Sequence, residues 1–337
     1  MAHVNRLLII IILALAQPLT AAPAMRPKNI PCAPPDYRIY HRSIARIHDL
    51  IASQQYNDAL VAYKNVFTSY DFVFLRDYKI AAQLALYLGR PGEALGFVHK
   101  GFAAGMTPKQ IRKHAFLRQL TDQPDWKKLK KQYPAQRGIY QQRINPAVRA
   151  EVQAMFRKDQ WKALGALFTF SSRRQDHYAE KRFAPHSQIQ LARLTRILKA
   201  YGYPGEKLTG NGSWGAVILS HHNSISQRHA LADTLYPALK PKLLNALALG
   251  QLSPYELALI DDWYVAVKSS RREKRYGYMD DVLTETERDK VNEWRGEIGL
   301  SRVETINALM DRQQETGLNF HLPFRQPAKT RIRPDSL

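Results

Sequence analysis

The chain has 337 residues, enough for two domains that each bury a core, and 45% of them are hydrophobic, which excludes an intrinsically disordered protein. It carries 50 lysines and arginines against 29 aspartates and glutamates, a formal net charge of +21. Cys32 is its single cysteine, which excludes an intramolecular disulfide and any CxxC metal or redox motif.

The first residues follow the plan of a secretory signal peptide: a weakly basic start, an apolar run at residues 7–16, and small residues at a cleavage site. The run Ala22-Pro23-Ala24 fits the A-x-A pattern, so we expect cleavage after Ala24, with cleavage after Ala21 as the alternative. An apolar run of ten residues makes about 15 Å of helix, half of a bilayer core, which disfavours a membrane anchor. We therefore assign residues 1–24 to a signal peptide and expect an exported protein, periplasmic or secreted, with no membrane span once mature.

Residues 40–131 carry apolar side chains at helical spacing, which predicts helices near residues 43–53, 56–67, 74–87 and 93–103. Within this region the string "AAQLALYLGRPGEALGFVHKGFAAGM" resembles a tetratricopeptide repeat, with alanines where helices come close. The following string "LRQLTDQPDWKKL" resembles the segment that often closes such arrays. The resemblance implies helical hairpins that bind a protein or peptide in a groove, or that serve only as a stacking platform.

The apolar pattern is lost at Pro134, Gly138 and Pro146, so we place a linker at residues 132–147 and a second domain at residues 148–320.

Helical spacing in the second domain predicts helices near residues 148–169, 187–201 and 230–249, with a further helix that starts at Ser253-Pro254 and another that starts at Thr284. Residues 321–337 are rich in proline and basic side chains, which predicts a disordered basic tail. The predicted fold class is mainly α, with tetratricopeptide-like helical hairpins followed by a second helical domain.

The order of motifs in residues 150–305 resembles an uncharacterised bacterial family, classed as a domain of unknown function and often found behind a signal peptide and tetratricopeptide-like helices. Its hallmarks are Asp-Gln, Gly-Trp-Pro, Gln-His, Asp-Arg, Tyr-Gly-Thr-Gln and a closing Arg-x-x-Ile-Gly-Leu. The matching strings here are "DQ" at residues 159–160, "RILKAYGYPGEKLTG", "WGAVILSHH", "GQLSPYELALIDDW", "RYG" and "VNEWRGEIGLS". Trp263, Tyr278 and Met279 depart from the hallmark Arg, Thr and Gln, so the resemblance implies the helical fold more safely than any activity.

The polar residues at these hallmarks form a candidate polar site. A histidine paired with an aspartate is a general base with its orienting partner. We expect one of the two adjacent histidines to be a buried, hydrogen-bonded side chain and the other to be exposed in a cleft. The histidine spacing is a poor match to metal-ligand patterns, so no metal site is predicted. The candidate residues are Asp159, His221, His222, Asp262, Tyr276 and Arg295.

Two functional hypotheses follow, and neither involves a cofactor or an assigned catalytic residue, because no G-x-S-x-G, H-E-x-x-H, Walker or Rossmann motif occurs. In the first, the chain is an exported binding or scaffold protein of the bacterial cell envelope. Its residues 101–200 carry 21 basic and 6 acidic side chains, a net of +15, which suits an anionic or peptide partner, although a solvated basic face is the simpler reading. Export disfavours a nucleic-acid partner.

The second hypothesis is a hydrolase-like enzyme with a small site around His221, His222, Asp262 and Tyr276. Whether these four side chains converge in one pocket distinguishes it from the first.

Overall fold

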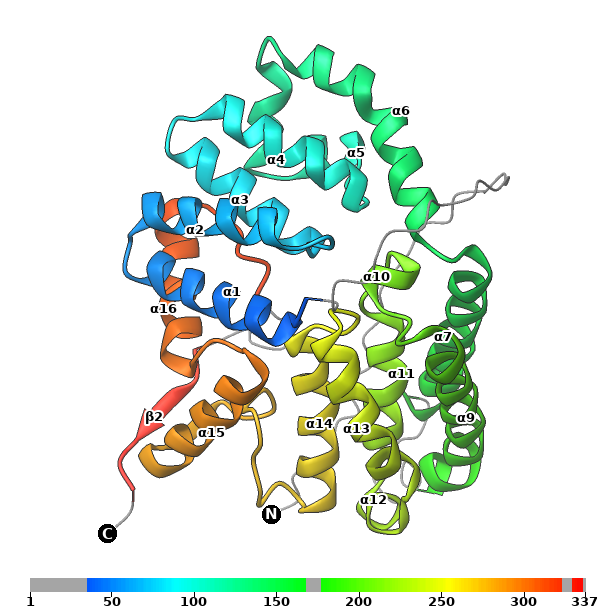
Figure 1. Cartoon of the computed structure of the whole chain (residues 1–337). Coiled ribbons are helices and arrows are strands. Elements are labelled where there is room, and N and C mark those ends of the chain that lie inside the picture. Colours follow the sequence, from blue (N-terminus) through cyan, green and yellow to red (C-terminus); the bar gives the residue numbers. More distant parts are fainter. Residues whose placement is uncertain (1–34, 168–176, 323–328, 336–337) are drawn as a thin grey trace.

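The computed structural model describes residues 35–167, 177–322 and 329–335, and Figure 1 shows an assembly made almost entirely of helices. The mainly α prediction is confirmed. The strands among the described residues are β1 (Val282–Thr284) and β2 (Arg331–Arg333), which pair in parallel with Val282 opposite Arg331. The predicted signal peptide, residues 1–24, lies outside the described residues.

The first part of the chain is a series of helices in which neighbours in sequence pack on one another, as the hairpin prediction requires. Asp36 caps the first helix through the amide of Arg38, and the buried face of that helix repeats at Tyr40, Ile44 and Ile47. The tetratricopeptide-like character of these hairpins stays a prediction. The elements are α1 (Tyr37–Ala52), α2 (Tyr56–Ser69), α3 (Leu75–Tyr87), α4 (Pro91–Ala104), α5 (Pro108–Lys113), the 3-10 helix η1 (Leu117–Asp122) and α6 (Trp126–Arg143).

The predicted linker at residues 132–147 is wrong, because α6 continues through Pro134 to Arg143 and the next helix begins at Pro146. A proline inside a helix removes one hydrogen bond, and here buried side chains at both ends of α6 hold it in place. One of them, Tyr140, packs against Gly105 and Gly210, where an added Cβ would collide with its ring. Both glycines have positive φ angles, which also favour glycine.

The second part of the chain surrounds one central helix, α11, whose residues are all buried and which packs against α7, α9 and α14. The helices predicted to start at Ser253-Pro254 and at Thr284 do so, and a capping box forms at each start. The helix predicted at residues 230–249 is divided, because the Asp233 carboxylate accepts the amides of Leu235 and Tyr236 and starts a new helix there. The elements are α7 (Pro146–Leu167), the π-helix η2 (Ala179–Phe183), α9 (Ala184–Tyr201), α10 (Glu206–Thr209), α11 (Trp214–Asn223), α12 (Gln227–Ala232), α13 (Leu235–Ala248), α14 (Pro254–Lys268), α15 (Glu285–Ile298) and α16 (Val303–Thr316).

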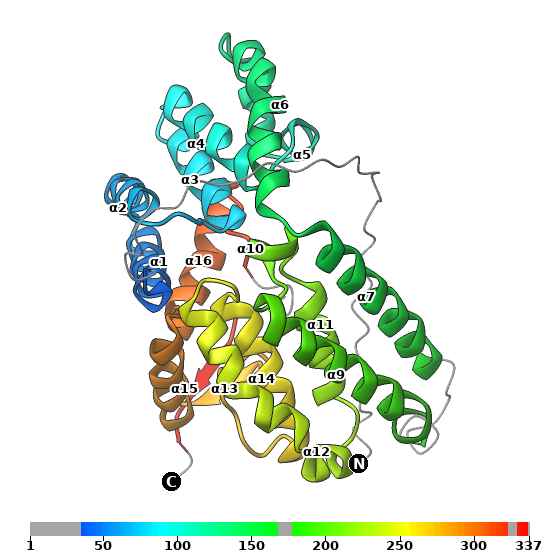
Figure 2. The ribbon, with the colours of Figure 1, turned by 45° about the vertical axis from the view of Figure 1, so that its right-hand side comes forward.

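Two main hydrophobic cores divide the described residues, but they do not follow the chain in order. One core spans α1 to α6 and the other spans α7 to α15. Ile306, Leu309, Leu318 and Phe320 belong to the first core, so the end of the predicted second domain packs with the N-terminal helices. Figure 2 shows α16 beside α1, in line with this arrangement.

The described part of the predicted disordered tail is ordered, which corrects that prediction. Strand β2 pairs with β1, and Thr330 exchanges backbone hydrogen bonds with the side chain of Asn307. The Asp335 carboxylate accepts a hydrogen bond from the Thr286 hydroxyl at 2.6 Å, near the start of α15. Among the described residues, no helix combines the length and the apolar character needed to cross a membrane.

Candidate functional site

His221 and Asp159 form a buried pair between α11 and α7. The Nδ1 atom of His221 lies 2.6 Å from Oδ2 of Asp159, and the two residues are 7% and 0% exposed. The ring of Phe183 approaches His221 edge-on at 6.1 Å. This is the arrangement of an imidazole oriented by a carboxylate. However, Nε2 of His221 is itself buried and has no hydrogen-bond partner among the described residues, so the basic nitrogen is covered.

His222 belongs to a different set of contacts, because adjacent residues on a helix point about 100° apart. Its Nδ1 lies 3.0 Å from the Ser187 hydroxyl, and its Nε2 lies 3.3 Å from Asp233 Oδ2. The residue is 1% exposed. The expectation that one of the two histidines is exposed in a cleft is therefore wrong. Both are buried because α11 is enclosed by other helices along its length.

Asp262, Tyr276 and Arg295 form a third set, which holds a turn of backbone. The two carboxylate oxygens of Asp262 accept the amides of Tyr276 and Tyr278, each at 2.5 Å. The Arg295 guanidinium donates to the carbonyls of Tyr276 and Ser301 at 2.8 and 3.0 Å. Burial raises the pKa of Asp262 to about 7, against the lowering effect of the two amides and of Arg295.

The six predicted residues therefore come together as two separate groups, with His222 in contacts of its own. No hydrogen bond or ion pair between described residues joins either histidine to Asp262 or to the side chain of Tyr276. The described residues also contain no group of three or more His, Cys, Asp or Glu side chains placed to hold a metal ion. This geometry gives the hydrolase-like hypothesis no common site.

Sequence reasoning missed a charged residue at the junction of the two parts, Arg76 in the first turn of α3. Its guanidinium carbon lies 4.0 Å from the centre of the Tyr255 ring, which belongs to α14. Its Nε is 3.4 Å from Oδ1 of Asp77, whose other oxygen accepts a hydrogen bond from Tyr40 at 2.6 Å. The Arg76 side chain keeps 22% exposure, and its two terminal nitrogens have no hydrogen-bond partner among the described residues.

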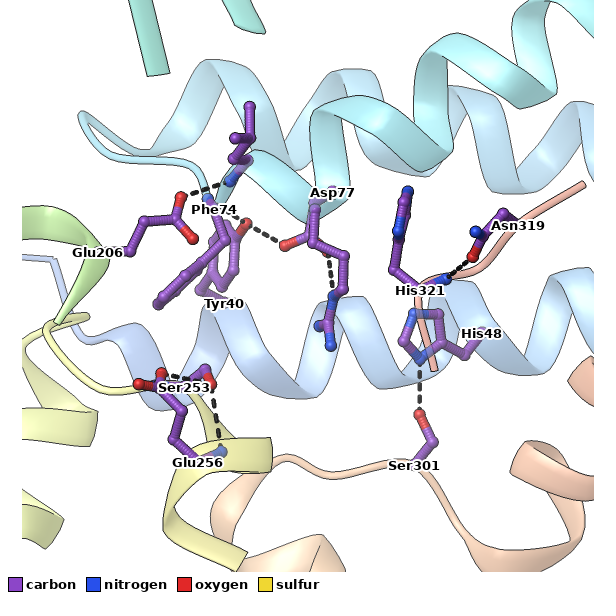
Figure 3. Close-up of polar contacts among 12 residues, drawn as sticks. Tyr40, His48, Phe74, Asp77, Glu206, Ser253, Glu256, Ser301, Asn319 and His321 are labelled. Atoms are coloured by element: carbon purple, nitrogen blue, oxygen red, sulfur yellow. Dashed lines mark hydrogen bonds and ion pairs between the residues drawn. The ribbon is translucent and has the colours of Figure 1, made fainter. Parts of the chain in front are cut away.

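The surroundings of Arg76 come from both parts of the chain, as Figure 3 shows for the polar contacts around Asp77. Glu206 of α10 accepts the amide of Leu75 at 2.7 Å and so caps α3. Glu256 of α14 accepts the amide and the hydroxyl of Ser253. The side chains that this view labels are Tyr40, His48, Phe74, Asp77, Glu206, Ser253, Glu256, Ser301, Asn319 and His321.

Burial at this junction suppresses the charges of the titratable neighbours of Arg76. It raises the pKa of Glu256 to about 8 and also raises the pKa of Glu206. It lowers the pKa values of His48 and His321 to about 3, so both imidazoles are neutral at physiological pH. Burial works against the charge of Arg76 too, but Tyr255, Asp77, Tyr63 and Tyr40 together outweigh it and raise its pKa, so the guanidinium stays charged.

The segment after α16 brings His321 to this junction. The side-chain amide of Gln83 of α3 makes two hydrogen bonds with the backbone of Asn319. It donates to the carbonyl and accepts from the amide, both at 2.8 Å. His321 then adopts a positive φ of 49°, which is uncommon for a residue other than glycine. Its Nε2 is buried without a hydrogen-bond partner among the described residues.

Comparison of the chain with protein-family models, with curated proteins and with solved structures finds no match. The resemblance to a domain of unknown function therefore stays a prediction. The sequence signal for the Arg76 junction is the string "FLRDYKIAAQLAL", where Arg76 and Asp77 begin a helix that is otherwise largely apolar. Charged residues are rarely enclosed in a protein unless they are paired or functional, which makes such a pair informative.

Glu256 is expected to make the protein less stable as pH rises. Its folded-state pKa of about 8 lies above the ordinary value of 4.5, so its contribution is full below pH 4.5 and is lost as pH rises through 8. Glu256→Gln keeps an oxygen for Ser253 but cannot ionise. In urea unfolding between about pH 5 and 8, we expect its free energy of unfolding to fall less steeply than that of the unmodified protein.

The matched control for this experiment is Glu287→Gln, at the same capping-box position of α15. Burial opposes the charge of Glu287, but the hydrogen bonds from Lys274 and the Thr284 amide and the nearby positive charges together outweigh it and lower its pKa below 4.5. Glu287 therefore titrates below the measured window, and its replacement should leave the slope unchanged. Equal slopes for the unmodified protein and Glu256→Gln would contradict the prediction.

Proposed function

We propose that the protein is an exported binding protein of the bacterial cell envelope that takes an anionic group of its ligand at Arg76. The observation that carries this proposal is the partly buried guanidinium, 22% exposed, with both terminal nitrogens free of hydrogen bonds among the described residues. A guanidinium presents its donors in a planar fork that matches a carboxylate or phosphate group. The Tyr255 ring, whose centre lies 4.0 Å from the guanidinium carbon, holds the guanidinium in place before any ligand arrives.

The position of Arg76 supports a binding role, because ligand sites often lie where two parts of a protein meet. The raised pKa of Glu256, about 8, reduces the negative charge that would compete with an anion. The positive charge of residues 101–200 would attract an anionic ligand from a distance. The ligand class is therefore a carboxylate or phosphate, including an acidic or C-terminal group of a peptide, which is the partner type that tetratricopeptide-like hairpins imply.

The test is thermal and urea unfolding with added inorganic phosphate, sulfate, acetate or citrate, each compared with chloride at constant ionic strength. An anion at 100 times its dissociation constant adds about 2.7 kcal/mol to the free energy of unfolding. We expect Arg76→Gln to abolish this gain and Arg76→Lys to retain part of it, since lysine keeps the charge without the fork.

The control is Arg137→Gln, because Arg137 also stacks on a tyrosine, Tyr140, but belongs to α6. This variant should respond to anions like the unmodified protein. Failure of all four anions to stabilise the protein, or an equal gain in Arg76→Gln, would show that Arg76 does not bind them.

We prefer binding to the hydrolase-like alternative. The alternative has one favourable contact, the 2.6 Å pair of His221 and Asp159, and the nitrogen that would act as a base is buried. A general base must come within hydrogen-bond reach of the proton that it removes.

A further inference from the structure

The α7–α9 hairpin carries an outward face with an unusual combination of side chains. Trp161 of α7 is 75% exposed and Ile189 of α9 is 59% exposed. The basic residues exposed on α7, η2 and α9 are Arg157, Lys158, Lys162, Lys181, Arg182, Arg193, Arg196 and Lys199.

These side chains share one side of the molecule. Both helices pack on α11, so their exposed residues face away from it, and Figures 1 and 2 show the two helices side by side at the edge of the assembly. The hairpin is antiparallel, with Glu151 paired to Arg196 at 2.7 Å and Gln190 bonded to the carbonyl of Met155. On α7, Lys158, Trp161 and Lys162 lie three and four residues apart and so form one patch.

Little negative charge offsets this face. Asp159 is fully buried against His221, and Glu151 is paired with Arg196. Glu180 is bonded to Ser226 and Arg228. The exposed charges of the described hairpin are therefore basic. Two of them, Lys158 and Lys162, flank the exposed Trp161 on α7, and exposing so large an apolar side chain to water is unfavourable.

We propose that this face docks on an anionic phospholipid surface. Tryptophan prefers the boundary between headgroups and hydrocarbon, while lysine and arginine pair with anionic headgroups. Each basic side chain near such a surface strengthens binding several-fold, and the attraction is screened within a Debye length. An exposed tryptophan distinguishes this face from an ordinary solvated basic surface. Docking here does not involve Arg76, which belongs to α3.

The experiment is co-sedimentation with vesicles of phosphatidylcholine alone or mixed with phosphatidylglycerol, at low and high salt. It uses both the full chain and a form that begins at Met25. The shorter form lacks the apolar run at residues 7–16, so comparing the two separates binding by that run from binding by the α7–α9 face. We expect binding to the mixed vesicles only, weakened by salt. The variants Trp161→Ala and Lys158→Gln/Lys162→Gln should each weaken it about tenfold or more.

The matched control is Lys127→Gln/Lys128→Gln, which removes two exposed charges from α6, where the neighbouring Trp126 is buried. It should bind within about twofold of the unmodified protein if the location of charge matters. Lipids brominated in the acyl chain should quench the fluorescence of Trp161, and Trp161→Phe should remove that quenching.

Three results would overturn the proposal. Equal binding to both kinds of vesicle would remove the role of anionic lipid. Unchanged binding by Trp161→Ala, with circular dichroism intact, would remove the role of the tryptophan. Binding to duplex DNA but not to vesicles, lost in the lysine variant, would identify a nucleic-acid surface instead.

Discussion

Replacement of Asp262 by alanine is expected to lower the free energy of unfolding by about 3–5 kcal/mol, the loss typical when one partner of a buried charged network is removed. The substitution leaves the amides of Tyr276 and Tyr278 without acceptors inside the protein. It also removes the carboxylate near Arg295, which is 0% exposed and cannot turn to solvent without moving its helix. Equilibrium unfolding in urea, followed by circular dichroism, measures the change.

Two further variants make the Asp262 experiment specific. Asp262→Asn keeps one acceptor oxygen but turns an amino group toward the second amide, so we expect a smaller loss, about 1–3 kcal/mol. Asp289→Ala removes an aspartate whose side chain is 65% exposed and paired with Arg288, and it should cost less than about 1 kcal/mol. A similar small loss for Asp262→Ala would show that its two short hydrogen bonds do not hold the turn.

Replacement of His221 by alanine is expected to be about as damaging, again about 3–5 kcal/mol, because it leaves the fully buried Asp159 carboxyl group without its partner. If His221 instead served mainly to bind a ligand, the loss of stability would be small, because functional residues are often unfavourable for stability. His177→Ala, at an exposed position, is the control and should stay within about 0.5 kcal/mol.

A double-mutant cycle tests whether the pair itself is responsible. We expect His221→Ala combined with Asp159→Asn to lose less stability than the sum of the two single variants, with a coupling of about 0.5–3 kcal/mol. Strict additivity would mean that the 2.6 Å contact contributes nothing beyond the packing of each side chain.

The features that the sequence predicted correctly are local ones. The helix starts at Ser253 and Thr284 depend on residues within three positions, and the helices depend on spacings of three and four residues. The predicted linker and tail failed for a related reason. Proline and basic residues indicate a weak local preference for helix or strand. Partners far away in the sequence order these segments instead, as β1 does for β2.

The Arg76 junction could not be predicted, because its parts come from far apart in the chain. Leu75 meets Glu206 across 131 positions, and Gln83 meets Asn319 across 236. Asp159 and His221 were both named through hallmark motifs, but nothing in the sequence indicates that they touch across 62 positions. Burial decides whether His221 and Asp159 can reach a substrate, and their burial depends on which helices surround α11.

The return of α16 to α1 affects how the chain can be divided and when its first core can form. His48 bonds to Ser301, Asp49 bonds to Thr305, and Ile306 and Leu309 fill the apolar surface beside them. A fragment that stops before α16 would expose that surface to water and invite aggregation. During synthesis the core of α1 to α6 stays incomplete until α16 and the segment to Phe320 leave the ribosome, so closure of the first core follows translation of those residues.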